Sequence, residues 1–261
     1  MTNPVVTFEA LHVPGDPLVL FNIWDAGSAK VVAAAGARAI ATGSYGVAEA
    51  QGFKDGEALA LKDALTNLRR IVSVTDLPVT IDMESGYGAS PEEVGRSVAL
   101  AGEAGAVGIN MEDRMPGASE LTPIAEQSAR IEAAAASGLF VNARCDAFRG
   151  HPAQDHGPQL VARVIERARA YADAGASGLF VPFTDDRGCI AAICRASPLP
   201  VNVLWAPAFG TRAQIAELGV ARISHGHQPW AAAMAWLGEQ ATAVLGGGIP
   251  PYAGQAGRTE S

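Results

Sequence analysis

The sequence is poor in charged residues and has no long apolar run. The first feature bears on the protein surface, and the second argues against a membrane-spanning protein. Only 18% of its 261 residues are charged, whereas about 25% is usual in soluble domains. This predicts a surface of small neutral residues, or one partly buried in an oligomer. No apolar run reaches the roughly 18 residues that a membrane span needs. Residues 1–18 also lack the charged and apolar regions of a signal peptide. We therefore expect no membrane partner.

Cysteine is scarce as well, and negative charge is in excess. Cys145, Cys189 and Cys194 are an odd, low count without a paired framework, which is typical of a reducing compartment and predicts a cytoplasmic protein. The formal net charge of −8 argues against a nucleic-acid partner, because little would neutralise phosphates along a backbone. An anionic substrate would need a local cation or a metal ion.

Short apolar runs alternate with longer amphipathic segments along the chain. The runs do not alternate internally, which is typical of parallel strands buried on both faces. The predicted strands are Leu18–Asn22, Arg38–Thr42, Pro78–Asp82, Ala106–Met111, Leu139–Ala143, Gly178–Val181, Pro200–Leu204 and Val220–Ser224. Helical patterns include Leu59–Val74, Pro91–Ala104, Ile124–Ser137, Pro158–Ala174 and Trp230–Leu245.

Eight such strand–helix units predict an α/β fold, a closed (β/α)8 TIM barrel that forms a single domain over residues 1–261. An open doubly wound sheet is the alternative, but no G-x-G-x-x-G follows the first strand. The Gly/Pro-rich tail, residues 246–261, is expected to be flexible or to contact a neighbouring subunit.

Acidic side chains gather at the predicted strand ends, where barrel enzymes place their functional groups. Asp82 and Glu84 end the third strand, Glu112 and Asp113 end the fourth, and Asp55 follows the second. Crowded carboxylates repel one another unless a proton, an arginine or a hard divalent cation compensates them. Since no His or Cys lies in this cluster, the donors suit Mg²⁺ or Mn²⁺. Pairing with arginines in a purely structural network is the alternative.

Arg144, at the end of the fifth strand, is a candidate for binding a carboxylate or stabilising an enolate. Its alternative role is a salt bridge that only holds the acids together. The small-residue turn ATGSYG, residues 41–46, would expose backbone N–H groups to an anion, although many strand ends look alike.

These segments resemble the isocitrate lyase / phosphoenolpyruvate mutase superfamily, in its phosphonomutase-like or oxaloacetate-decarboxylase-like branch. The resemblance runs over about 200 residues in the expected order. It is carried by NIWDAGSA (22–29), IATGSYGVA (40–48), KDGE (54–57), PVTIDMESGYG (78–88), AGAVGINMEDR (104–114), VNARCDAF (141–148), RARAYADAGASGLFVP (167–182), PVNVL (200–204) and LGVARISHG (218–226).

The resemblance implies a role for each matching residue. Asp82 would contact Mg²⁺ directly, and Glu84, Glu112 and Asp55 would hold its water molecules. Ser44, Tyr45 and Gly46 would bind the substrate carboxylate through backbone N–H groups, while Arg144 and Asn202 would contact the substrate. A homotetramer, a dimer of dimers in which a C-terminal helix swaps between subunits, is implied too, with Trp230–Leu245 as that helix. Its apolar residues also fit ordinary core packing.

Departures from the family pattern narrow the activity. The lyases carry a Lys-Lys-Cys-Gly loop after the fourth strand, but here that loop is MPGASELTP, residues 115–123. The phosphonopyruvate enzymes carry Lys, Asn or Thr in that loop and a His at the end of the sixth strand, where this chain has Pro182. Cys145 should point away from the site and does not replace the missing cysteine.

A histidine after the eighth strand favours decarboxylation. His225 and His227 follow that strand, and a His near this place resembles the superfamily's oxaloacetate decarboxylases. His227 could manage the proton that an enolate needs, with Arg144 and Asp55 in the expected catalytic set; a helix cap or a subunit contact is its alternative role. We therefore expect a Mg²⁺-dependent lyase that cleaves a carbon–carbon bond of a small 2-oxo or 2-hydroxy acid, in the manner of an oxaloacetate decarboxylase or a 2-methylisocitrate lyase. The alternatives are a silent 2-oxo acid binder and a phosphonopyruvate hydrolase or mutase.

Overall fold

The computed structural model describes residues 3–252. Eight parallel strands follow one another around a nearly closed barrel in the order β1-β8-β7-β6-β5-β4-β3-β2, and a parallel bridge from Ile23 to Thr42 links the two ends of that order. This confirms the barrel against the open sheet. The strands are β1 (Leu18–Leu20), β2 (Ile40–Ala41), β3 (Val79–Asp82), β4 (Gly108–Glu112), β5 (Phe140–Arg144), β6 (Gly178–Val181), β7 (Val201–Leu204) and β8 (Arg222–Ser224).

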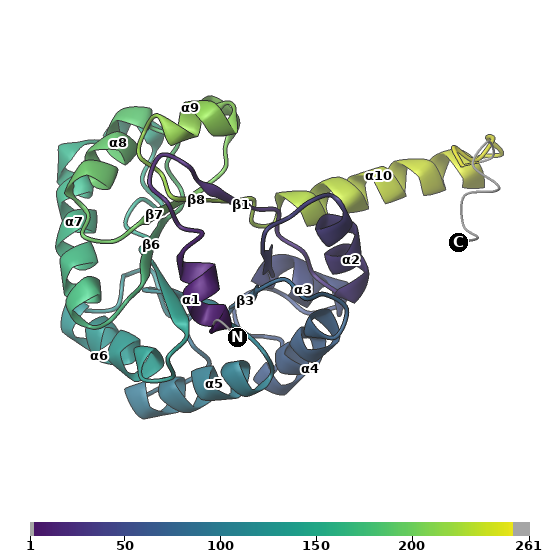
Figure 1. Ribbon diagram of the computed structural model, residues 1–261. Coiled ribbons are helices and arrows are strands. Elements are labelled where there is room, and N and C mark those ends of the chain that lie inside the picture. Colours follow the sequence, from purple (N-terminus) through teal and green to yellow (C-terminus); the bar gives the residue numbers. More distant parts are fainter. Residues whose placement is uncertain (1–2, 253–261) are drawn as a thin grey trace.

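The helices lie outside the strands, and most of them form a ring around the barrel (Figure 1). They are α1 (Pro4–Glu9), α2 (Ala26–Ala34), α3 (Ser44–Ala50), α4 (Leu61–Val72), α5 (Pro91–Glu103), α6 (Ile124–Ala135), α7 (Pro158–Asp173), α8 (Arg187–Ala196), α9 (Arg212–Ala216) and α10 (Gln228–Leu245). Short 3₁₀ turns lie at Ala153–Asp155 and Pro207–Phe209. No helix of residues 3–252 is both long and apolar enough to cross a membrane.

Local signals in the sequence explain where several helices begin and end. Ser90 caps α5 in a reciprocal capping box with Glu93, and Pro91 takes the first helical position. Gly105 and Gly175 follow α5 and α7 with φ of +100° and +91°, a backbone conformation that glycine adopts at little cost.

α1 covers the amino end of the barrel (Figure 1). Phe8 packs edge-on against Phe140 of β5, with ring centroids 5.3 Å apart, and His12 stacks on the same ring at 4.3 Å. Gly108 leaves room for this plug, because a Cβ there would lie 3.1 Å from the Phe8 ring. Burial lowers the pKa of His12 to about 3, with the charge of Arg222 acting in the same direction.

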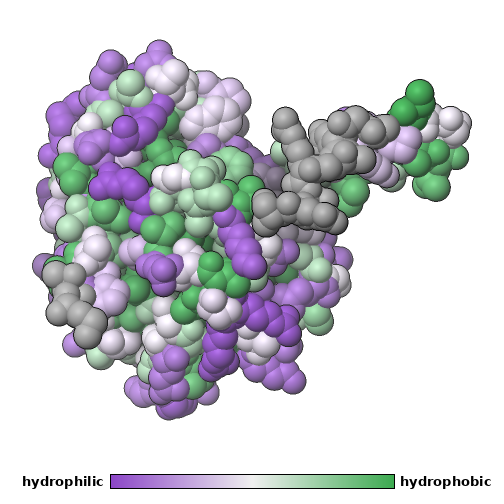
Figure 2. Space-filling model, turned by 45° about the vertical axis from the view of Figure 1, so that its right-hand side comes forward, coloured by the Kyte–Doolittle hydropathy of each residue, from purple (hydrophilic) through white to green (hydrophobic). Residues whose placement is uncertain are grey.

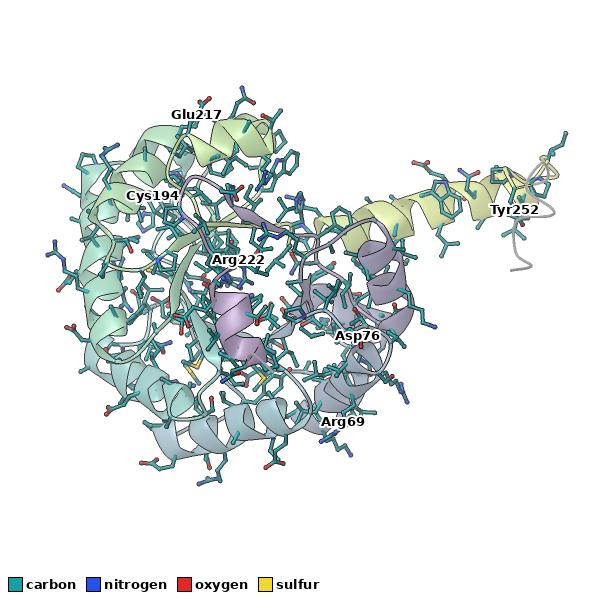
Figure 3. All side chains as sticks on the ribbon, viewed as in Figure 1. Arg69, Asp76, Cys194, Glu217, Arg222 and Tyr252 are labelled. Carbon is teal, nitrogen blue, oxygen red and sulfur yellow. The ribbon has the colours of Figure 1, made fainter. Side chains whose placement is uncertain are left out.

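Polar side chains fill the middle of the barrel. Asn110 Oδ1 accepts hydrogen bonds from Asn142 Nδ2 at 2.8 Å and from Arg222 Nη2 at 3.0 Å. Arg222 lies inside the barrel, 0% exposed (Figure 3), and its Nε and Nη1 atoms have no hydrogen-bond partner in the described chain. Burial lowers its pKa to about 9. This buried cation has one hydrogen-bond partner among residues 3–252, Asn110, and the charge of Asp82 acts to raise its pKa.

α10 leaves the barrel and projects from it as an arm (Figure 1), with apolar residues on its surface (Figure 2). Trp230 at its base packs edge-on against Trp24, with ring centroids 5.2 Å apart. Further along, Trp236 and Leu237 are 55% and 51% exposed. Packing of this helix in its own barrel, one of two alternatives from the sequence, therefore holds only at its base. Of the predicted tail, residues 253–261 lie outside the described residues.

Candidate active site

The carboxyl ends of the strands surround a cavity of about 570 Å³. It contains most of the residues expected from the sequence, namely Ser44, Tyr45, Asp55, Asp82, Glu84, Glu112, Arg144 and His227. The remainder of its wall includes Asn22, Asn110, Arg114, Arg149, Phe180, Phe183 and residues 115–118. The cavity therefore combines acids and arginines at the end of the barrel where active sites form.

Asp82 ends β3 on the cavity wall. Its Oδ2 accepts the backbone N–H of Ser44 at 3.3 Å, and its Oδ1 accepts that of Glu84, also at 3.3 Å. Burial raises the pKa of this carboxyl above its ordinary value, against the lowering effect of Arg144, and the charge of Asp55 raises it further. The turn at Ser44 therefore directs an N–H group into the site, but towards Asp82.

Glu84 and Glu57 join the loop that precedes α4 to the loop after β3 through reciprocal hydrogen bonds. Glu84 Oε2 accepts the N–H groups of Gly56 and Glu57 at 2.7 and 2.6 Å. Glu57 Oε1 in return accepts the N–H groups of Ser85 and Tyr87 at 3.0 and 3.1 Å. Burial raises the pKa of Glu84 to about 7, aided by the charges of Asp82 and Asp55. These bonds explain why KDGE and DMESGYG act as one unit.

Arg130 holds the second of these loops from behind. It is 0% exposed, and its Nη2 donates to the carbonyls of Ser85 and Gly88 at 2.7 and 3.0 Å. Gly88 is required here, since a Cβ would lie 2.6 Å from the Val94 nitrogen at the start of α5. Buried hydrogen bonds thus fix the backbone next to Glu84.

Glu112 and Arg144 face each other across adjacent strands. They occupy partner positions of β4 and β5, and Arg144 Nη1 lies 2.6 Å from Glu112 Oε2. Arg144 also donates from Nε and Nη2 to the two carboxylate oxygens of Asp146, at 2.6 and 3.0 Å. Burial raises the pKa of Glu112 to about 8, against the lowering effect of Arg144. Arg144 therefore forms a salt bridge with Glu112 within the cavity.

Asp113 follows Glu112 but points away from the cavity. Its Oδ2 accepts from Arg167 Nη1 at 3.0 Å and from the Tyr171 hydroxyl at 2.7 Å, both on α7. Its Oδ1 accepts the backbone N–H of Asp146 at 2.9 Å. The two neighbouring acids therefore have different positions: Glu112 lines the cavity, and Asp113 joins the barrel to α7.

The acids fit a hard divalent cation by their chemistry. Burial raises the pKa values of the Asp82, Glu84 and Glu112 carboxyl groups. A cation bound beside them would therefore favour their ionised forms. Within residues 3–252 no three His, Cys, Asp or Glu side chains form a ready-made ligand cluster. Mg²⁺ commonly takes only one or two carboxylates and keeps several waters, which is compatible with this arrangement.

The two histidines after β8 differ in their surroundings. His225 stacks on Trp205, with ring centroids 5.7 Å apart, and burial lowers its pKa. His227 is exposed, lines the cavity and lies edge-on to Tyr45 at 5.5 Å. It occupies the N-cap position of α10 without a capping hydrogen bond, so its side chain is not used as a helix cap.

Two residues expected to bind substrate lie away from the cavity wall. Asn202 is 1% exposed and exchanges hydrogen bonds with Ser224 Oγ inside the barrel. Gly46 is buried in α3, where a Cβ would lie 3.2 Å from Trp230 Cβ and 3.4 Å from Trp24 Cβ. Gly46 thus permits the close approach of α10, and Asn202 belongs to the polar interior.

Arg114, Arg149 and Phe183 are cavity residues that the sequence interpretation missed. All three lie in loops beyond the strand ends, where spacing predicts no direction for a side chain. Phe183 has a φ of +64°, which is uncommon for a bulky residue. The only available signal was position, because each lies within a few residues of a predicted strand end.

Comparisons with known proteins identify the family of this chain. The model of the phosphoenolpyruvate phosphomutase family matches residues 8–245. An uncharacterized Mycobacterium tuberculosis protein is 37% identical over 244 residues, 93% of this chain and 90% of its own. The 2-methylisocitrate lyase of Escherichia coli K12 is 30% identical over 190 residues, covering 68% and 62%. An oxaloacetate decarboxylase of Paraburkholderia xenovorans is 29% identical, covering 89% and 79%.

Solved structures share the fold. A Burkholderia cenocepacia protein described as a "putative phosphonomutase" is 48% identical, with a TM-score of 0.89 and coverage of 92% of this chain and 100% of its own. A phosphonopyruvate hydrolase, crystallised with oxalate and Mg²⁺, superposes with a TM-score of 0.83 at 24% identity, covering 99% and 91%. The α/β barrel fold of this chain is thus shared by many solved structures. The chain belongs to the phosphoenolpyruvate mutase / isocitrate lyase superfamily, whose members include lyases and mutases.

Proposed function

We propose that this protein is a Mg²⁺-dependent carbon–carbon lyase that acts on a small 2-oxo or 2-hydroxy di- or tricarboxylic acid through an enolate. The observation that carries the proposal is the meeting of Asp82, Glu84 and Glu112 with Arg144 in one cavity. The named relatives that cleave 2-methylisocitrate and decarboxylate oxaloacetate support it.

Asp82 would hold the cation directly, with Glu84, Glu112 and Asp55 holding its waters. The bound cation would supply a Lewis acid for the 2-oxo group. The N–H groups near Ser44 and Tyr45 would orient the substrate carboxylate. Oxalate and Mg²⁺ in the hydrolase crystal support this ligand chemistry; Mn²⁺ has the same preference for oxygen donors.

Oxaloacetate-type decarboxylation is our preferred reaction. The bond between C3 and the distal carboxyl carbon breaks, CO₂ leaves, and the electron pair moves through C2 to the carbonyl oxygen. Arg144 stabilises the enolate charge as it develops, and a proton delivered to C3 completes pyruvate. His227, which lines the cavity without a capping role, is placed to manage that proton.

The quaternary arrangement is also part of the proposal. The projecting α10, with Trp236 and Leu237 exposed, supports a homotetramer in which this helix packs on a neighbouring barrel. The three free cysteines support a reducing, cytoplasmic location.

Proton NMR of the purified protein with Mg²⁺ tests the activity against oxaloacetate, 2-methylisocitrate, isocitrate and phosphonopyruvate. We expect pyruvate or glyoxylate to form faster than in a control with metal alone, and both chelation and Asp82→Ala to abolish the difference. Phosphate release from phosphonopyruvate would instead establish a hydrolase. Tight oxalate binding without turnover of any acid would establish a silent 2-oxo acid binder, and either result would overturn the lyase.

A further inference from the structure

Arg149 brings a second guanidinium to the cavity, beside Arg144. It lies in the loop after β5 and its side chain is 46% exposed. Arg149 Nη1 donates to Asp146 Oδ2 at 3.2 Å, and Arg144 Nη2 donates to the same oxygen at 3.0 Å. The two nitrogens therefore share one carboxylate oxygen and lie close together. Asp146 orients both side chains.

Phe183 is in contact with both of these cations. The guanidinium carbons of Arg144 and Arg149 each lie 5.3 Å from the centroid of its ring, within the range of cation–π attraction. The φ of +64° at Phe183 is a backbone strain that functional sites often retain. This turn after β6 places the ring against the pair of arginines.

The two arginines differ in the donors that they have left. Arg144 commits Nε and Nη2 to Asp146 and Nη1 to Glu112. Arg149 has five N–H donors, and among residues 3–252 its side chain makes one hydrogen bond, through Nη1. Its remaining donors are free for an anion at the rim of the cavity.

We propose that Arg149, oriented by Asp146 and Phe183, binds the distal carboxylate of the substrate and so selects diacids over monoacids. The inference rests on the proposed function, which places the 2-oxo or 2-hydroxy end of the substrate at Asp82 and Arg144; in the proposed decarboxylation the carboxylate at Arg149 is the one that leaves as CO₂. Phe180, Pro182 and Leu204 line the same cavity and offer an apolar wall to the carbon chain between the two ends. A planar guanidinium with neighbouring donors matches a carboxylate.

The test compares matched acids that differ only in the distal group. Isothermal titration of the Mg²⁺-supplemented protein uses malate against 2-hydroxybutyrate, and 2-oxoglutarate against 2-oxovalerate. Oxalate, which has no distal arm, probes the reacting end alone. We expect the wild-type protein to bind the diacid of at least one pair about 10- to 100-fold more tightly, the range for a charge-assisted hydrogen bond.

Arg149→Met should abolish this preference and leave the oxalate Kd within about twofold of wild type, while Arg149→Lys should restore part of it. Arg69→Met, on the outside of α4 (Figure 3), is the matched control and should change neither affinity. Equal weakening of oxalate and diacids by Arg149→Met would show that Arg149 only supports Arg144, and would overturn the proposal.

Other outcomes separate this subsite from the reaction. If the wild-type protein prefers the diacid in neither pair, the subsite is overturned. It is also overturned if Arg114→Met abolishes the preference and Arg149→Met leaves it unchanged. Phosphonopyruvate binding that is tighter than any diacid and depends on Arg149 would replace the carboxylate with a phosphonate. If oxalate fails to bind while a diacid binds through Arg149, the proposed function fails and the subsite stands.

Discussion

Removal of the Asp113 carboxylate should destabilise the protein strongly, although Asp113 lies outside the cavity. Asp113 is 0% exposed and Arg167 is 5% exposed, so Asp113→Ala leaves a buried guanidinium without its anion. Loss of one partner of a buried pair costs about 3–5 kcal/mol. For a chain of this size, 1 kcal/mol lowers Tm by about 2–4 °C, so we expect a loss of roughly 6–20 °C.

Partner variants distinguish the ion pair from simple packing. Tyr171→Phe removes two hydrogen bonds, one donated to Asp113 Oδ2 and one accepted from Arg167 Nη1, both at 2.7 Å, and should cost about 1–3 kcal/mol. The double variant Asp113→Leu with Arg167→Met removes both charges and should be more stable than Asp113→Ala. Arg169→Met, an exposed position on the same helix, should stay within about 0.5 kcal/mol of wild type.

Urea denaturation followed by circular dichroism measures all four variants under one set of conditions. If the unfolding free energy falls with urea concentration at the same slope in every variant, the free energies of unfolding can be compared directly. If Asp113→Ala costs less than about 1 kcal/mol, or if the double variant is the least stable, Asp113 does not hold the barrel to α7. Because Asp113 Oδ1 also accepts the Asp146 N–H, the same variant should weaken oxalate binding through Asp146 and Arg144.

Four further predictions follow from buried or exposed groups. Burial lowers the pKa of His12 from its ordinary 6.5 to about 3 in the folded protein. The contribution of neutral His12 to the free energy of unfolding is therefore complete above pH 6.5 and falls in acid, by about 2 kcal/mol at pH 5. Urea titrations of His12→Phe should lack this loss of stability in acid. Arg222→Met should cost less than about 1 kcal/mol in the same assay, because a buried cation with one partner stabilises little. Mn²⁺ affinity, measured by electron paramagnetic resonance, should rise from pH 6 to 8 as Glu84 and Glu112, with pKa values of about 7 and 8, lose their protons; a flat profile would contradict this. Trp236→Lys with Leu237→Lys should shift sedimentation towards smaller species if α10 joins subunits.

The sequence predicts the barrel well because most strand residues are buried and several helices carry their own end signals. The α5 signals at Ser90 and Pro91 are local chemistry, independent of the remainder of the fold. Alternation along a strand separates Glu112 from Asp113, and likewise places Cys145 outside the barrel wall, where it is 0% exposed. Such features depend on a few neighbouring residues, which the sequence shows directly.

The parts that the sequence did not predict depend on contacts between distant segments. Glu57 bonds to Ser85 and Tyr87, far along the chain, and no local pattern distinguishes it from Asp55. Asn202 has the right residue type for substrate binding, yet its position on β7 places its side chain against the Ser224 hydroxyl inside the barrel. Arg149 and Phe183 meet only because their loops leave adjacent strands, β5 and β6.

In the proposed reaction Arg144 would exchange one partner for the substrate. Its Nη1 atom is paired with Glu112 at 2.6 Å, and burial raises the pKa of that carboxyl to about 8 against the effect of the arginine. With a divalent cation bound, the Glu112 charge would be compensated from the metal side, and Nη1 could turn to the substrate. Asp146 would keep its two bonds to Nε and Nη2, which orient the guanidinium. Glu112 and Asp146 would thus have separate tasks in the proposed reaction: Glu112 would be exchanged for the substrate, and Asp146 would fix the orientation of the arginine.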